Sequence, residues 1–236
     1  MADSLKEAKL LFITTADTEI VAAARATELL PEDFPELRCA NPAKLEDVGS
    51  FLDEALAETR AVLVRLLGGR GAWPEGFEEL LRRCGKLGIP LLAFGGEAEP
   101  DAELTALSTA PSGAVAEAFE YLRWGGVANT ANLLRFVADT LLLEGYGFEP
   151  PASVPELGVY HPELPDGSAL EDLLALHDAA LPTVGVIFYR THLLGGNTAF
   201  VDTLVAKLEE AGANPLPVGP VPGNSLLSGT FANEYQ

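Results

Sequence analysis

The sequence has few basic residues, few histidines and few cysteines. Only 15 Lys and Arg stand against 35 Asp and Glu, which leaves a formal net charge of -20. Because DNA, RNA and anionic membrane surfaces repel an acidic chain, we expect no nucleic-acid partner and no membrane partner. Three histidines, and two cysteines without CxxC spacing, predict no closed metal site and fit a reducing compartment.

Long apolar runs are also absent from the sequence. No run approaches the ~18 to 20 residues that a membrane-spanning helix needs. The N-terminal stretch MADSLKEAKLLFITT leads directly into an expected strand and lacks the uninterrupted apolar region of a secretory signal. We therefore expect a cytoplasmic globular protein, whose 48% hydrophobic content is ample for a buried core.

Several common catalytic and nucleotide-binding motifs are missing. The GxGxxG pattern does not follow the first expected strand, and GGRGAWPEG has neither the spacing nor the lysine of a P-loop. No GxSxG elbow occurs. Trp73 and Trp124 stand at expected helix ends, where large aromatic residues usually fill the core, so we interpret both as core residues.

The first half of the chain alternates between apolar runs and amphipathic patterns. We expect Asp17 to cap a helix that continues to about Leu30. This rhythm predicts an α/β fold with a mainly parallel, Rossmann-like sheet flanked by helices. The expected strands are 9–14, 36–40, 60–67 and 89–94, and the expected helices are 17–30, 44–58 and 74–88.

Small and polar residues follow three of these strands, in the stretches TTAD, GGRG and GGE. Parallel sheets bind ligands beyond the carboxyl ends of their strands. We therefore predict that Thr15, Gly69 and Gly96 lie on one rim of the sheet and contribute to a ligand site.

The second half of the chain changes character. Two helices are expected between residues 114 and 144, joined around Gly125 and Gly126, and five prolines follow between residues 149 and 167. The predicted organisation is an N-terminal α/β domain (1–148), a Pro-rich connection with a short helix (149–181), the βαβ start of a second α/β unit (182–218) and a linker-like tail (219–236).

The stretch 184–218 is predicted to form that βαβ unit. We expect VGVIFY to be a largely buried strand, followed by a helix with one apolar face and then a second strand. If the unit is incomplete, the strand that ends at Val218 should lack neighbours and expose an apolar face. The expected apolar face of the helix consists of Phe200, Val201, Leu204, Val205 and Leu208.

Two interpretations of the segment between this strand and helix remain open. A glycine-bearing loop at a helix N-terminus can hold a carboxylate or phosphate, with help from a nearby cation. Alternatively the glycines only form a turn, and Asn197 or Thr198 caps the helix. The candidate ligand-binding residues are Arg190, His192, Gly195, Gly196 and Asn197.

Tyr160 and His161 lie in an expected extended segment, GVYHPE, and are further candidates. A histidine can bind a metal or relay protons, but no second ligand stands near this one in the sequence. The alternative is a surface histidine in a turn that Pro162 fixes. We expect His177 to face solvent, and no nucleophile and base can be paired, so the catalytic residues stay unknown.

Four stretches carry a resemblance to a known family. They are VRLLGGRGAWPEGFEELLRRCGKLGIPLLAFGGEAEPDAEL, AFEYLRWGGVANTANLLRFVADTLL, GVYHPE and PTVGVIFYRTHLLGGNTAFVDTLVAKLEEAGANPLPV. In this order they resemble the N-terminal part of the large subunit of cobaltochelatase (CobN), a family related to the large subunit of magnesium chelatase. The arrangement of FYR followed by GNTAFVDTL is the most specific part.

The resemblance implies a role in aerobic cobalamin biosynthesis. The large subunit is expected to hold hydrogenobyrinic acid a,c-diamide and Co²⁺, while separate AAA+-type subunits hydrolyse ATP. The implied partners are these chelatase subunits and the corrin substrate. No cofactor is expected to bind tightly to this chain alone, and we expect the chain alone to be inactive.

Members of the family are much longer, so the resemblance also implies that this chain is a fragment. The metal and catalytic residues are then expected in the missing region, and none is assigned here. A stand-alone, non-catalytic α/β module that binds a small ligand or a partner is the alternative, as is a relative of the magnesium chelatase large subunit.

Overall fold

The computed structural model describes residues 9–154, 158–165 and 168–219. The chain divides into two compact units, residues 1–152 and residues 153–236. Each unit has its own sheet.

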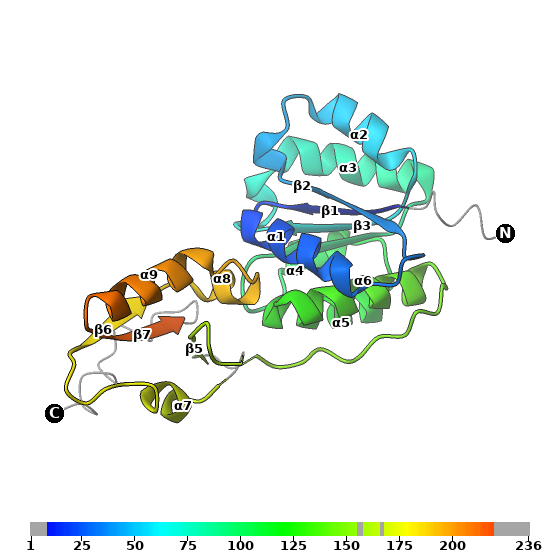
Figure 1. The fold of residues 1–236 in the computed structure, drawn as a ribbon. Helices are drawn as coiled ribbons and strands as arrows, with labels where there is room; N and C mark the ends of the chain where they lie inside the picture. Colours follow the sequence, from blue (N-terminus) through cyan, green and yellow to red (C-terminus); the bar gives the residue numbers. More distant parts are fainter. Residues whose placement is uncertain (1–8, 155–157, 166–167, 220–236) are drawn as a thin grey trace. The chain divides into compact units, whose positions relative to one another are not determined.

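The first unit is built on a four-stranded parallel sheet with strand order β2-β1-β3-β4 (Figure 1). The predicted mainly parallel α/β sheet is therefore confirmed. The apolar runs form the strands because burial on both faces suits continuous Val, Leu and Ile sequences. The strands are β1 (Lys9–Thr14), β2 (Glu36–Ala40), β3 (Thr59–Leu66) and β4 (Leu91–Gly95).

Helices cover both faces of this sheet and make two separate cores (Figure 1). The core on one face takes side chains from α1 (Asp17–Ala26), α5 (Ser112–Trp124) and α6 (Val127–Leu141). The core on the other face takes them from α2 (Val48–Leu56), α3 (Pro74–Leu87) and α4 (Ala102–Leu107), of which α4 was not predicted. Short 3-10 turns occupy Thr27–Leu29, Pro42–Lys44 and Gly69–Ala72.

Local sequence signals set several helix ends. Pro74 opens α3, and Gly88 ends it in the left-handed conformation with φ 69°, as the sequence predicted. The prediction that Asp17 caps α1 was wrong. Ala16 occupies the cap position without a side-chain cap, and Asp17 is the first helical residue.

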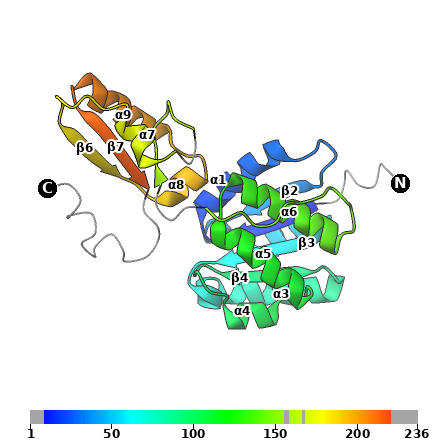
Figure 2. The same ribbon diagram turned by 90° about the horizontal axis from the view of Figure 1, so that it is seen from below.

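The second unit contains a three-stranded sheet with strand order β5-β7-β6. Figure 2 shows α9 running alongside β6 and β7, which it joins into a parallel βαβ unit. The predicted βαβ arrangement of this stretch is thus present. Its elements are β5 (Gly158–Val159), α7 (Leu170–Leu174), β6 (Thr183–Ile187), α8 (Arg190–Leu194), α9 (Ala199–Glu210) and β7 (Asn214–Gly219).

Three expectations about this unit were wrong. β6 is not buried, because it forms an outer strand and four of its five residues are exposed. The strand that ends near Val218, β7, does have neighbours on both sides, and the open strand is β6 instead. On α9 only Val201 and Val205 are buried, while Phe200 and Leu204 are exposed.

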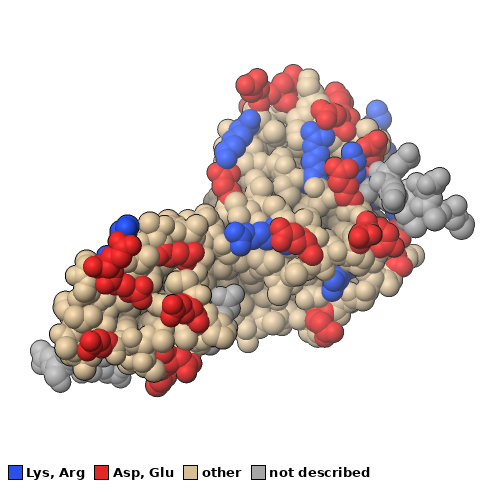
Figure 3. All heavy atoms as spheres, in the orientation of Figure 1, with Lys and Arg blue, Asp and Glu red and all other residues tan. Residues whose placement is uncertain are grey.

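Acidic side chains are spread over the surface. On the face drawn in Figure 3, Asp and Glu side chains lie over both units, and most of the Lys and Arg side chains lie on the first unit. Among the described residues, every helix is too short or too polar to cross a membrane.

Candidate functional site

Five ring side chains of the second unit form a continuous group, called here the aromatic cluster. The ring centroids lie 6.2, 6.4, 5.0 and 6.5 Å apart from one ring to the next. The rings come from the segment after β5, from the two residues between β6 and α8, from α8 and from α9. In order along the cluster they are Tyr160, Phe188, Phe200, His192 and Tyr189.

The inner end of the aromatic cluster is fixed by hydrogen bonds and packing. The Tyr160 hydroxyl lies 2.6 Å from Asp202 Oδ1 and 3.0 Å from Thr198 Oγ1, at the start of α9. Phe188 is buried with Val201 in the small core of this unit. The positions of these rings are therefore set by the packing of α9 on the sheet.

The outer end of the cluster is open. Tyr189 is 77% exposed, Phe200 is exposed and His192 is half-buried. Exposed aromatic faces that gather in this way are uncommon on a protein surface and bind flat apolar ligands well. The arrangement can hold the face or edge of a planar molecule, with the imidazole of His192 as a hydrogen-bonding group.

The predicted loop between β6 and α9 is partly helical. Residues 190–194 form α8, so Arg190 and His192 are helical residues, and Gly196 follows with φ 64°. Asn197 donates its backbone N–H to the His192 carbonyl at 2.8 Å. Thr198 is the cap residue of α9, without a side-chain cap.

An anion bound at the start of α9 would be repelled by the nearby carboxylate of Asp202. Asp202 lies in the first turn of α9 and supplies the negative charge that a helix N-terminus favours. The anion-binding role of Gly195, Gly196 and Asn197 stays a prediction, and we base no function on it.

His161 does not join the aromatic cluster. It is buried rather than on the surface, so the expectation of an exposed turn histidine was wrong. Its Nε2 lies 3.3 Å from Glu209 Oε1, and its Nδ1 accepts the Glu163 N–H at 3.3 Å. His177 is half-buried as well, with Nε2 2.9 Å from the Pro215 carbonyl oxygen. Both histidines link segments of this unit, and among the described residues neither belongs to a group of three or more His, Cys, Asp or Glu side chains that could hold a metal ion.

In the first unit, the loops that carry Thr15, Gly69 and Gly96 do meet at one end of the sheet. Thr15 Oγ1 accepts the Leu67 N–H at 2.9 Å. A Cβ atom on Gly96 would lie 2.6 Å from Leu67 Cγ, and one on Gly69 would lie 3.1 Å from Asp101 Oδ2. Leu67 and Asp101 therefore occupy the space beside these two glycines, and the ligand role of the rim remains a prediction.

A charged network near the carboxyl ends of β1, β3 and β4 was not predicted from the sequence. Arg65 of β3 contacts Glu19 Oε1 at 2.7 Å and donates to the Gly95 and Leu122 carbonyls at 3.2 and 2.9 Å. The Thr14 hydroxyl donates to Glu19 Oε2 at 2.6 Å. Each of these groups has a partner, so the network is structural. An arginine inside the apolar run RAVLVRLL was the signal for it.

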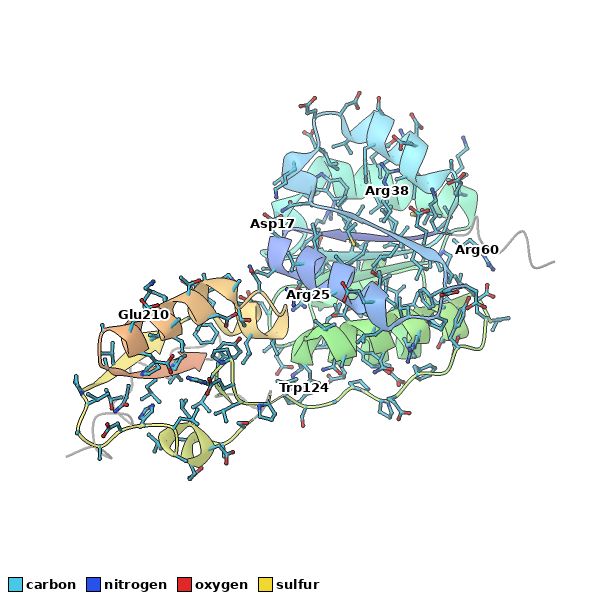
Figure 4. The ribbon with its side chains drawn as sticks, in the orientation of Figure 1. Asp17, Arg25, Arg38, Arg60, Trp124 and Glu210 are labelled. Atoms are coloured by element: carbon cyan, nitrogen blue, oxygen red, sulfur yellow. The ribbon has the colours of Figure 1, made fainter. Side chains whose placement is uncertain are left out.

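Asp17 serves a similar linking role at the start of α1 (Figure 4). Its carboxylate accepts from Lys44 Nζ at 2.7 Å and from Asn41 Nδ2 at 2.9 Å. These two donors, Lys44 first, lower the pKa of Asp17. Within the described residues, no group of three or more His, Cys, Asp or Glu side chains is placed to hold a metal ion.

Sequence reasoning found the polar members of the aromatic cluster, Tyr160 and His192, but missed Phe188, Tyr189 and Phe200. The first two belong to VGVIFY, which was interpreted as core, and Phe200 was assigned to the buried face of α9. The stretch FYRTH places three ring side chains within five residues, and that density was the available signal.

Comparisons with known proteins show that the chain is similar to the CobN and magnesium chelatase family. Residues 119–229 match the family described as CobN/Magnesium Chelatase. Over 214 residues the chain is 35% identical to the aerobic cobaltochelatase subunit CobN of Pseudomonas aeruginosa, a match that covers 89% of this chain and 17% of that protein. It is 30% identical over 104 residues to the H-type magnesium-chelatase protein of Rhodobacter capsulatus, covering 42% of this chain and 9% of that protein.

A solved structure is similar over the same extent. The catalytic subunit of cobaltochelatase from Mycobacterium tuberculosis superposes with a TM-score of 0.66 at 35% sequence identity, covering 90% of this chain and 16% of that protein. The chain therefore spans less than a fifth of the length of these two cobalt-type relatives.

Proposed function

Because the chain belongs to the CobN/magnesium chelatase family, we propose that it acts as the N-terminal part of the tetrapyrrole-binding large subunit of a cobaltochelatase. The observation that carries the proposal is the 35% identity over 214 residues to the Pseudomonas cobaltochelatase subunit. That match covers 89% of this chain, whereas the Rhodobacter magnesium-type relative covers 42% of it. The difference favours cobalt over magnesium as the substrate metal.

In this proposal the complete complex works in the cytoplasm and inserts Co²⁺ into hydrogenobyrinic acid a,c-diamide for aerobic cobalamin synthesis. Co²⁺ and the corrin are substrates, and ATP is hydrolysed by separate AAA+-type subunits. This chain contributes binding, not metal insertion, and is inactive alone.

The aromatic cluster is the part of this chain that we expect to contact the macrocycle. Tyr189 and His192 offer flat, accessible rings, and ring stacking on a planar conjugated system is favourable by roughly 0.5–1.5 kcal/mol per ring pair beyond area burial. Phe188 and Tyr160 hold the outer rings in place because they are packed and hydrogen-bonded beneath them. Stacking needs no cation, which suits a chain of net charge -20.

The net charge of the chain predicts how its affinity for the corrin depends on ionic strength. A corrin with free carboxylate arms is anionic, and the chain repels it at long range. Salt screens that repulsion, so we expect affinity to rise with ionic strength. A site built on arginine pairs with carboxylates would show the opposite trend.

The test is an absorbance titration of the 236-residue chain with hydrogenobyrinic acid a,c-diamide, run in parallel with a porphyrin. We expect a spectral shift with a dissociation constant of about 1 μM for the corrin. No shift up to the solubility limit would contradict tetrapyrrole binding by this chain. Tighter binding of the porphyrin would assign it to the magnesium type.

A further inference from the structure

The outer edge of β6 carries backbone groups that point away from its partner strand. Phe188 donates its N–H to the Val218 carbonyl of β7 at 3.2 Å. In a parallel ladder, alternate residues direct their N–H and C=O groups to the same neighbour. Thr183, Gly185 and Ile187 therefore face outward, and within the described part of the chain β6 pairs with β7 alone.

On its other side, β7 pairs with the short strand β5 and carries two prolines. Pro215 and Pro217 direct their backbone toward the β5 side of β7, and proline has no N–H to donate. Their carbonyl oxygens are already occupied, by His177 Nε2 at 2.9 Å and by the Tyr160 N–H at 3.1 Å. Within the described residues, β7 therefore offers no free backbone N–H to a further strand beyond the two residues of β5.

Helix α9 extends apolar side chains over the open edge. Val201 is fully buried against the sheet, and Asp202 lies on the β5 flank of the helix because it contacts Tyr160. Successive helical residues are about 100° apart, so Phe200 lies on the opposite flank, toward β6, with Leu204 one turn later. Both side chains are exposed.

The edge is apolar on both faces of the sheet. Val184 shares the α9 face with Phe188, and Ile187, which is 70% exposed, lies on the other face. The stretch TVGVIF contains no charged residue. Such an edge fits an uncharged strand that is buried on both faces, as in parallel sheets. We call this region the β6 edge surface, formed by Thr183, Val184, Gly185, Ile187 and Leu204, with Phe200 at its border with the aromatic cluster.

We propose that the β6 edge surface binds an uncharged β-strand from the remainder of a cobaltochelatase-type large subunit, which extends the β5-β7-β6 sheet. The inference rests on the family assignment and not on tetrapyrrole binding. This chain covers 17% of the Pseudomonas relative, so most of such a subunit lies outside it. A second copy of this chain is the disfavoured occupant, because it would bring together two molecules that each carry a net charge of -20.

The first arm of the test uses the 236-residue chain alone. We expect a monomer in analytical ultracentrifugation, and we expect the amides of Thr183, Gly185 and Ile187 to exchange hydrogen at least about tenfold faster than those of Val184 and Val186. The inward amides serve as the internal control because they are already bonded to β7. A dimer whose outward amides are protected would overturn the proposal in favour of a second copy.

The second arm uses the intact Pseudomonas relative. Lysine at the position aligned with Ile187 should lower its melting temperature by several degrees, because the charge would enter a strand interface. The same change in this chain, Ile187→Lys, should leave the melting temperature unchanged, since the side chain is exposed here. Leu176→Lys, at another exposed aliphatic residue of the unit, is the matched control in both proteins. If the intact relative tolerates lysine at the Ile187 position as well as at the Leu176 position, the proposal is wrong.

Discussion

At the scale of single residues, Gly76 leaves room for the indole ring of Trp73 at the start of α3. Trp73 is the cap residue of α3, and its indole ring packs over Gly76 in the first turn. A Cβ atom on Gly76 would overlap the indole. Trp73 is buried and packs in the core beside α3, so a shift of its ring would disturb neighbouring core side chains.

Substitution of this glycine should therefore destabilise the first unit. Gly76→Ala should lower the free energy of unfolding by about 1–3 kcal/mol, because Trp73 must leave its rotamer. Gly85→Ala in the same helix meets no atom within 4 Å and should stabilise by roughly 0.5–1 kcal/mol. Urea denaturation of both variants, followed by circular dichroism, tests the contrast, and equal effects would contradict it.

Both thiols are predicted to be inert in the folded chain. Burial raises the pKa of Cys84 to about 12 and that of Cys39 to about 11. The reactive thiolate is thus nearly absent at about pH 8. Iodoacetamide should modify neither cysteine at that pH without denaturant and both in urea, as read by mass spectrometry. Rapid alkylation of Cys84 in the native protein would show that α3 does not pack as described.

Residue roles were predictable from the sequence where they depend on local backbone geometry. Pro74 and Gly88 were assigned correctly because proline fixes φ and glycine accepts the left-handed conformation. Asp17 and His161 were not, because Asn41, Lys44 and Glu209 reach them from distant parts of the chain. Single-residue chemistry that depends on tertiary contacts leaves no such local signal.

At the scale of elements, the two sheets differ in whether the outward backbone N–H groups of an edge strand are hydrogen-bonded. The outward N–H groups of β4 are bonded by side chains: Thr109 Oγ1 accepts from Leu91 and Ser108 Oγ accepts from Ala93, both at 2.9 Å. This arrangement closes the β4 edge to further strands. The β6 edge has no comparable bonds within the described residues.

Removing one of these hydroxyls should lower the free energy of unfolding. Thr109→Val keeps the shape but leaves the buried Leu91 N–H without a partner, and should cost about 1–3 kcal/mol of unfolding free energy. Thr27→Val, whose hydroxyl bonds an exposed carbonyl, should change stability by no more than about 0.5 kcal/mol. The denaturant midpoints of the two variants test this prediction. If Thr109→Val does not change the midpoint, another group must bond the Leu91 N–H.

Element existence was predictable wherever the apolar pattern was long. The strands β1, β3 and β4 and the helices α3, α5 and α6 occur where periodicity placed them. The short helices α4 and α8 span too few residues for a period to emerge. The prediction that β6 is buried was wrong. An apolar sequence makes a strand suitable for burial, but whether it is buried depends on the strands and helices beside it.

At the scale of the whole molecule, the two units differ in the size of their cores. The first unit packs helices on both faces of its sheet, whereas the buried cluster of the second consists of Phe188, Val201 and Val205. Because local stability follows buried apolar contact, we predict faster hydrogen exchange for residues 184–218 than for residues 60–94. Equal protection of the two segments in a monomer would contradict this prediction.

Tetrapyrrole binding by the aromatic cluster is tested by comparing the affinities of two single-residue variants. The dissociation constant for hydrogenobyrinic acid a,c-diamide is measured by absorbance for the unchanged chain, for Tyr189→Ala and for Leu143→Ala. Tyr189 and Leu143 are both exposed, but only Tyr189 belongs to the cluster. We predict about tenfold weaker binding for Tyr189→Ala, on the order of 1.4 kcal/mol, and no change for Leu143→Ala. Equal affinity of all three proteins, or no binding by any of them, would contradict the account.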